Sequence, residues 1–269
     1  MSTATDPYGT RYDEPARYFL YRLNPLAKIA GPLPFIVSLL FVRDIATPLL
    51  FVMLVYAVLL IGSRLTARRA LLLFVALPAV VLVLSVTLGA WVDAARVDDT
   101  EVLLQIGEYR FFAGSWLTGL ATALRLAALV SLALVSGLTT TGPVLVRALV
   151  QQLRVPYRIG YTILAAYRFL PRFQYELGVI RAAHRVRGTV GGKGPLVALR
   201  RGSGYLVPLL ASAIRHAERV ALAMDSRAFG AHRIRTERHL VPWRVRDWVF
   251  VFVFWIAGSA GIVAAAALF

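Results

Sequence analysis

Long apolar stretches constrain this chain more than any other feature of its sequence. The first runs from residue 29 to residue 61, and its 33 residues would form one helix roughly 50 Å long, at about 1.5 Å per residue. A hydrocarbon layer about 30 Å thick is crossed by roughly 20 apolar residues, so this run is too long for one span. Because Arg43-Asp44 interrupts it near the middle, it predicts two short spans, 29–42 and 47–62.

Three later apolar stretches complete the predicted membrane part, at residues 70–91, 114–138 and 247–268. The chain of 269 residues is 58% hydrophobic, and its mean hydropathy of +0.67 is higher than soluble domains normally show. We therefore predict an all-α membrane protein with about five transmembrane helices. The predicted parts are an N-terminal arm (1–27), transmembrane helices one to four (28–138), a region of two or three amphipathic helices (139–246) and a last transmembrane helix (247–269).

The distribution of charge predicts the orientation of these spans. Lysine and arginine are enriched in cytoplasmic loops close to membrane spans. The short basic loop at 64–69 is therefore expected in the cytosol, the acidic segment 92–110 outside, and 139–246 inside. Residues 147–246 hold 19 of the 30 basic residues and only four acids. We therefore predict a multi-pass protein of the cytoplasmic membrane with its N-terminus in the cytosol. If residues 29–61 formed a single span with a re-entrant turn, the predicted inside and outside positions of the later loops would be exchanged.

The basic region is predicted to consist of amphipathic helices separated by helix breakers. We expect helices at 143–153, at 156–187 with a kink at Pro171, and at 204–229, with a flexible linker at 188–194. Pro208 is expected in the first turns of the third helix. Such helices can lie on anionic lipid headgroups or against a partner protein, and composition leaves both alternatives open.

No catalytic constellation is found in the sequence. The chain has no cysteine, and its four histidines are scattered without carboxylates at ligand spacing, so we expect no catalytic residue, no metal site and no cofactor bound by this chain. The glycine-rich segment 188–194 lacks the spacing and the Ser or Thr of a phosphate-binding loop. The arginines are interleaved with apolar helical faces, which does not favour nucleic-acid binding.

Two arginine-containing segments stand out in the basic region. One ends at Arg187-Gly188, and the other contains Asp225-Ser226-Arg227-Ala228. Cations favour helix C-termini by about 0.3–1 kcal/mol through the helix dipole, which explains one such ending. It explains less well two similar endings on two helices of one membrane protein.

These segments resemble those of a known family, the transmembrane (T) component of energy-coupling factor transporters. The family's Ala-Met-Glu-Ala-Arg-Gly-Phe motif is similar to residues 223–229, and its Ala-Arg-Gly motif to residues 186–188. Four further segments match in order, at 24–28, 138–143, 168–171 and 207–210, so the resemblance covers most of residues 23–230. The departures are Val186 and Ser226 for alanine and Ala228 for glycine; we expect the close approach that glycine allows to differ at Ala228.

The resemblance implies a non-catalytic scaffold of an importer for vitamins or transition metals such as cobalt. Its partners would be two ATPase subunits of the ATP-binding-cassette (ABC) type, which bind the ATP, and a substrate-capturing membrane S component. The ATPase-coupling residues would be Arg187 and Gly188 on one helix and Asp225, Ser226, Arg227 and Ala228 on the other, with Asp225 holding the helix end or Arg227. The alternatives are a permease subunit of a conventional ABC importer and a membrane scaffold without a transport function.

Overall fold

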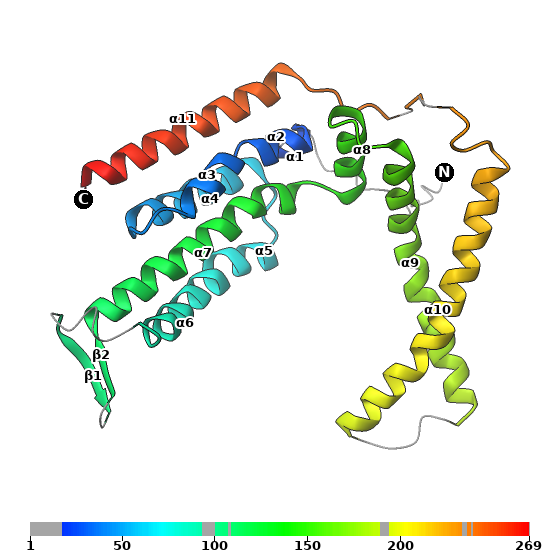
Figure 1. Cartoon of the computed structure of the whole chain (residues 1–269), viewed down its shortest axis with the longest axis horizontal. Helices are drawn as coiled ribbons and strands as arrows, with labels where there is room; N and C mark the ends of the chain where they lie inside the picture. Colours follow the sequence, from blue (N-terminus) through cyan, green and yellow to red (C-terminus); the bar gives the residue numbers. More distant parts are fainter. Residues whose placement is uncertain are drawn as a thin grey trace. The chain divides into compact units, whose positions relative to one another are not determined.

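The computed structural model describes residues 18–92, 100–106, 109–188, 194–232, 236–237 and 239–268. Most of the predicted N-terminal arm and of the 188–194 linker lies outside these residues. The chain divides into two compact units. We call residues 10–145 with 241–269 the apolar unit and residues 146–240 the hairpin unit, and each is described by itself (Figure 1).

The apolar unit is built almost entirely of helices, which confirms the all-α prediction. Its helices are α1 (Phe19–Arg22), α2 (Pro25–Ala30), α3 (Leu33–Leu39), α4 (Ala46–Gly62), α5 (Ala67–Leu71), α6 (Leu77–Gly89), α7 (Ala113–Thr139) and α11 (Val245–Leu268). Among the described residues, three helical stretches are long and apolar enough to cross a membrane: Ala67–Gly89, Ala113–Thr139 and Val245–Ala267. Two apolar stretches, Pro25–Leu39 and Ala46–Gly62, are shorter.

The first apolar run forms a pair of short antiparallel segments. At one end of the pair, a side chain on Gly62 would collide with Phe19 and Leu20. At the other end, the Arg125 guanidinium of α7 donates a hydrogen bond of 3.4 Å to the Val42 carbonyl. The chain thus enters and leaves residues 25–62 at the same end of the unit, which is the arrangement that two spans require. The Gly31-Pro32 step also divides the first segment into α2 and α3.

The third apolar stretch contains a π-helical segment, η1 (Leu72–Ala76), between α5 and α6. In a π-helix a carbonyl pairs with the N–H five residues ahead, and for Leu73 that residue is Pro78, which has no N–H. The Tyr56 hydroxyl of α4 donates to the Leu73 carbonyl instead. Pro78 therefore leaves the Leu73 carbonyl without a helical N–H partner inside the apolar unit, and Tyr56 of the neighbouring helix α4 supplies the hydrogen bond.

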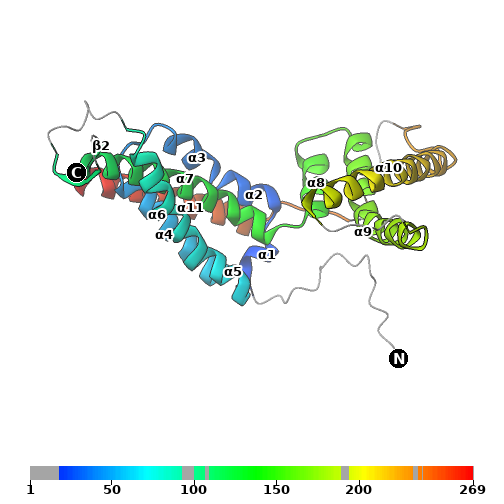
Figure 2. The ribbon, with the colours of Figure 1, turned by 90° about the horizontal axis from the view of Figure 1, so that it is seen from below.

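Close packing of α6 against α7 depends on small residues. A side chain on Gly119 would lie 2.2 Å from the Ser85 carbonyl oxygen, and one on Gly89 would lie 2.9 Å from that of Ser115. Small residues of this kind let membrane helices approach closely where burial of apolar area from water contributes little. Figure 2 shows α6 beside α7 along the unit.

The acidic segment between these helices contains a short β-hairpin, β1 (Val102–Ile106) and β2 (Tyr109–Phe112), where the sequence analysis expected only a loop. The strands are antiparallel, with Val102 opposite Phe112 and Ile106 opposite Tyr109. Apolar and aromatic residues on both sides of a two-residue connection containing glycine are a hairpin signal.

The hairpin unit consists of α8 (Gly142–Gln152), whose first turn belongs to the apolar unit, α9 (Tyr157–Val186) and α10 (Pro195–Asp225). Helix α9 matches its predicted bounds and continues through Pro171. Helix α10 begins nine residues before the predicted start at 204, with Pro195 in its first turn. Pro208, which was expected in the first turns, therefore lies in the interior of the helix. Proline favours the first turn of a helix, and of these two prolines it is Pro195 that begins α10.

Candidate coupling site at two helix ends

Arg187 occupies the C-cap position of α9, directly before a residue in the left-handed backbone region. The Arg187 N–H donates to the Ala183 carbonyl at 3.1 Å, and the Gly188 N–H donates to the Arg185 carbonyl at 3.1 Å. Gly188 has φ +70°, and apart from its chain neighbours no described residue has an atom within 4 Å of the position that a Cβ would take. Glycine is the residue that ends helices in this way, since it has no Cβ to clash.

Arg227 stands at the equivalent position after α10. Ala228 has φ 52°, its N–H donates to the Asp225 carbonyl at 2.9 Å, and the Phe229 N–H reaches back to the Met224 carbonyl at 3.0 Å. These two bonds make a Schellman motif with Ala228 at the left-handed position. Ala228 thus stands where backbone conformation favours glycine, which is a reason for a glycine here apart from the close approach expected from the sequence.

Both arginine side chains are exposed. Among the residues that the structure describes, neither guanidinium has a hydrogen bond or an ion pair. An ion pair in α9 joins two other residues, Arg172 and Glu176, at 3.4 Å. The Asp225 carboxylate is exposed and forms no ion pair with Arg227, so the expected local partnership of these two residues is not seen. The Ser226 hydroxyl donates to the Ala223 carbonyl at 3.1 Å and so belongs to the helix end.

The two arginines lie at opposite ends of one antiparallel helix pair. Three ring contacts between α9 and α10 give the register: His184 with Tyr205 at 5.1 Å, Phe169 with His216 at 4.3 Å, and Tyr157 with Phe229 at 5.7 Å. Arg227 therefore lies near the start of α9 and Arg187 at its end. The 30 residues of α9 separate these ends by about 45 Å at about 1.5 Å per residue. Figure 1 shows the two helices crossing, and Figure 2 shows them from below.

The end that carries Arg227 is fastened to the start of α9 by side chains. The Phe229 ring packs edge-on against Tyr157 and Tyr161, at 5.7 and 6.1 Å between centroids. The Arg158 guanidinium donates to the Gly230 carbonyl at 2.7 Å, and the Tyr157 hydroxyl donates to the His232 carbonyl at 2.6 Å. These contacts fix the turn that presents Arg227.

The middle of the helix pair holds a histidine in an arginine-rich setting. The His216 ring of α10 stacks on Phe169 of α9, with 15° between the ring planes. Burial lowers the pKa of His216, and the positive charges of Arg172 and Arg219 lower it further, while Glu176 opposes them. His216 is therefore neutral at pH 7, and its contribution to the pair is ring packing.

A buried polar cluster in the apolar unit was not predicted from the sequence. Lys28 is 2% exposed, and its ammonium donates to the Thr139 carbonyl, the last of α7, at 2.8 Å. Asp247 is fully buried, and its carboxylate accepts hydrogen bonds of 2.7 Å from the N–H groups of Asn24 and Arg244. The cluster thus ties α2, the end of α7 and the start of α11 together, at the two points where the chain leaves the unit for residues 146–240 and returns.

A sequence signal for this cluster exists in isolated charges of opposite sign. Lys28 precedes the first apolar run, and Asp247 precedes the last. A lone charge beside an apolar helix is usually paired or functional, so two of opposite sign are candidate neighbours. The segments 24–28 and 138–143 were noted only as matches to a family pattern, and the structure gives them a shared physical role.

The described residues hold no group of three or more His, Cys, Asp and Glu side chains that could bind a metal ion. His184 and His216 contact aromatic rings of the neighbouring helix.

Comparison with known proteins gives one family over most of the chain. The profile of the CbiQ family, described as cobalt transport protein, matches residues 16–238. Similar proteins are each named energy-coupling factor transporter transmembrane protein EcfT. The one from Bacillus selenitireducens is 27% identical over 91% of this chain and 92% of its own length. Those from Staphylococcus aureus (27%; 87% and 88%) and Exiguobacterium sibiricum (28%; 87% and 89%) are similar to a comparable extent.

Proposed function

The chain belongs to the CbiQ family and is a transmembrane component of an energy-coupling factor transporter, and on this basis we propose that its helix pair α9–α10 couples two ABC-type ATPases to a substrate-capturing membrane subunit. ATP binds to the ATPases and not to this chain. The transported substrate is a vitamin or a transition-metal ion, held by the separate subunit. The N-terminus and the helix pair lie in the cytosol, as the excess of arginine in residues 147–246 favours.

One observation carries this proposal: two exposed arginines, each directly before a residue with positive φ and unpaired among the described residues, end the two long helices of one hairpin, about 45 Å apart along α9. That spacing suits two separate partner subunits and not one pocket. A planar guanidinium binds a carboxylate through two parallel hydrogen bonds and stays charged when it is partly buried. Each arginine would enter a carboxylate-lined groove on one ATPase, with Gly188 or Ala228 ending the helix so that the arginine lies at its tip.

Force would then pass along the helix pair. When ATP binding draws the two ATPases together, the two tips move with them, and the ring contacts of α9 with α10 transmit the motion. The Phe229 and Arg158 contacts make the Arg227 end stiff. The Arg187 end is held to α10 by the ring contact of His184 with Tyr205 at 5.1 Å, three residues before Arg187.

The test uses charge reversal in the assembled transporter. Arg187→Glu and Arg227→Glu, singly and together, should weaken ATPase binding and abolish substrate-dependent ATP hydrolysis and uptake. Removing one partner of a desolvated charge pair costs about 2–5 kcal/mol, or at least roughly 30-fold in affinity. Arg187→Lys should lose part of this affinity, since lysine keeps the charge but not the planar fork.

The matched control is Arg215→Glu, because Arg215 is an exposed arginine in the interior of α10 and away from either helix end. It should leave assembly and uptake unchanged. Normal coupling in the double variant would refute the assignment of the arginines. Purification with two copies of this chain for each ATPase pair would instead favour a conventional permease.

A further inference from the structure

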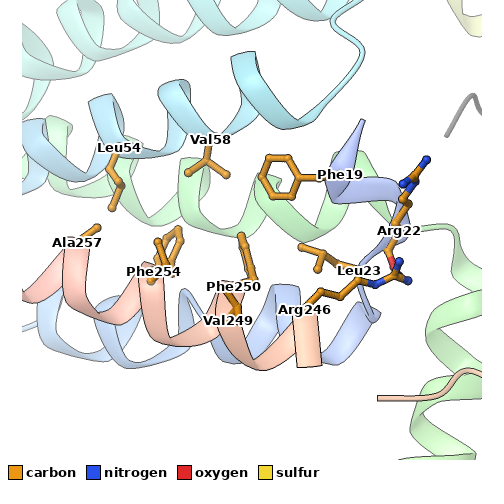
Figure 3. Close-up of a pocket in the computed structure, with 11 residues that line it drawn as sticks. Phe19, Arg22, Leu23, Leu54, Val58, Arg246, Val249, Phe250, Phe254 and Ala257 are labelled. Carbon is orange, nitrogen blue, oxygen red and sulfur yellow. The ribbon is translucent and has the colours of Figure 1, made fainter. Parts of the chain in front are cut away.

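The apolar unit contains a groove with two arginines at one end. It has a volume of about 410 Å³ and lies between α4 and α11, with α1 at its end. Its walls are apolar: Leu54 and Val58 come from α4, and Phe250, Phe254 and Ala257 from α11. Figure 3 shows these side chains along the groove, and it places Arg22 and Arg246 together at one end.

The two arginines share one site but have no counter-ion among the described residues. The Arg246 guanidinium donates to the backbone carbonyl of Arg22, which holds the Arg246 side chain at the mouth of the groove, and Arg22 also lines it. The nearest acid in the sequence, Asp247, is fully buried, and both of its oxygens are occupied by the N–H groups of Asn24 and Arg244. Two arginines at one end of a groove, without a carboxylate beside them in the part of the chain that is described, favour binding of an anion there.

Aromatic residues at the same end indicate the depth of this mouth. Trp243 and Trp248 contact each other at 5.3 Å just before and within the first turn of α11, and Tyr18 contacts Tyr21 at 6.5 Å beside α1. Tryptophan and tyrosine gather at the level of the lipid headgroups. The arginine pair therefore lies where lipid phosphates are, and the apolar groove extends from it toward the hydrocarbon.

We propose that this groove binds one anionic phospholipid, with the headgroup phosphate on Arg22 and Arg246 and an acyl chain along Leu54, Val58, Phe250 and Phe254. Basic pockets beside membrane helices are typical sites for anionic headgroups. A headgroup without a chain would leave the groove empty, and an uncharged lipid would leave the arginines without a counter-ion. The site lies outside the proposed coupling residues, so its test is separate from theirs.

The experiment compares lipids on the purified full-length chain by native mass spectrometry, with phosphatidylglycerol and phosphatidylcholine of equal chain length as probes. The wild type should retain one phosphatidylglycerol about 30-fold more strongly than phosphatidylcholine, which corresponds to about 2 kcal/mol for two arginines. Arg22→Gln with Arg246→Gln should reduce this preference to less than about threefold. Arg64→Gln with Arg68→Gln is the matched control, since both are exposed arginines that do not line the groove, and it should keep the wild-type preference.

Two further arms decide between a lipid and other occupants. Leu54→Trp fills the groove without changing charge and should weaken binding of long-chain phosphatidylglycerol while leaving a short-chain analogue unaffected. A photoreactive residue at Val58 in the complete transporter should cross-link to lipid. Equal retention of both lipids by the wild type, an unchanged preference in the Arg22/Arg246 variant, or cross-linking of Val58 to a protein subunit would each overturn the proposal.

Discussion

Replacement of Ala228 by glycine should stabilise the end of α10 that carries Arg227. Alanine at φ 52° is held in the left-handed region, which costs an L-residue about 1–2 kcal/mol. Glycine removes that strain but adds about 0.4–1 kcal/mol of conformational entropy to the unfolded chain. The net gain is about 0.5–1 kcal/mol, or roughly two- to fivefold in the equilibrium between closed and frayed helix end.

Hydrogen–deuterium exchange of the full-length chain measures this directly. The amides of Ala228 and Phe229 close the Schellman bonds, so their exchange, and that of the neighbouring end of α10, should slow by that factor in Ala228→Gly. Binding to the ATPases should be unchanged or slightly tighter, because the tip that carries Arg227 is better ordered before binding.

Two glycines of α9 provide matched controls. Gly188→Ala introduces alanine at φ +70° with no atom within 4 Å of the new Cβ, so backbone strain alone should destabilise the Arg187 end by about 1 kcal/mol. Gly178→Ala lies inside the helix in equally open space and should stabilise it by about 0.5–1 kcal/mol. If Ala228→Gly and Gly188→Ala shift exchange in the same direction, left-handed strain is not what controls these ends.

Three further variants test other parts of the structure. Lys28→Met leaves the Thr139 carbonyl without its buried donor and should lower the stability of the full chain by about 1–3 kcal/mol in a thermal melt, with Arg64→Gln as an exposed control that shows no change. Tyr56→Phe frees the Leu73 carbonyl and should cost about 1 kcal/mol in the same melt; an unchanged melt would refute the role of the hydroxyl in satisfying the π-helical segment. The pKa of His216 is lowered in the folded chain, so the histidine of the unfolded chain takes up a proton first as the pH falls. The α9–α10 contact should therefore weaken below about pH 6.5. Hydrogen–deuterium exchange of α9 and α10 should show this pH dependence in the wild type and lose it in His216→Phe.

Hydropathy alone predicted much of the apolar unit, because a lipid-facing helix must be apolar over its whole length. Predicted spans at 114–138 and 247–268 correspond closely to α7 and α11. The break at Gly31-Pro32 and the π segment before Pro78 were not predicted, since each depends on local backbone geometry inside an apolar run and leaves the hydropathy unchanged.

The candidate site was predicted in part. The arginines were found from two similar helix endings, and their positions at the ends of α9 and α10 follow from the residues around them. What the sequence does not contain is the antiparallel register of α9 and α10, which is set by ring contacts between distant residues such as Phe169 and His216. That register places the two arginines at opposite ends, and it turns two motifs into a pair of separated tips.

The sequence did not predict which buried charges lie close together or which residue takes a left-handed backbone conformation. Lys28 and Asp247 are 219 positions apart in the sequence, and their proximity in one buried cluster depends on how the first and last spans pack. The φ angle of Ala228, which favours glycine at this position, is a further feature that only coordinates provide.

The central claim is that each arginine tip meets a different ATPase in the cytosol. The chain has no cysteine, so Val186→Cys and Ser226→Cys, one at each tip, give single thiols for short cross-linkers in vesicles that contain the complete transporter. The account predicts that each thiol cross-links to an ATPase, that the two adducts in a double variant involve different ATPase copies, and that neither thiol reacts with an impermeant reagent from outside. Labelling of either thiol from the external medium, or cross-links of both to a single ATPase copy, would contradict it.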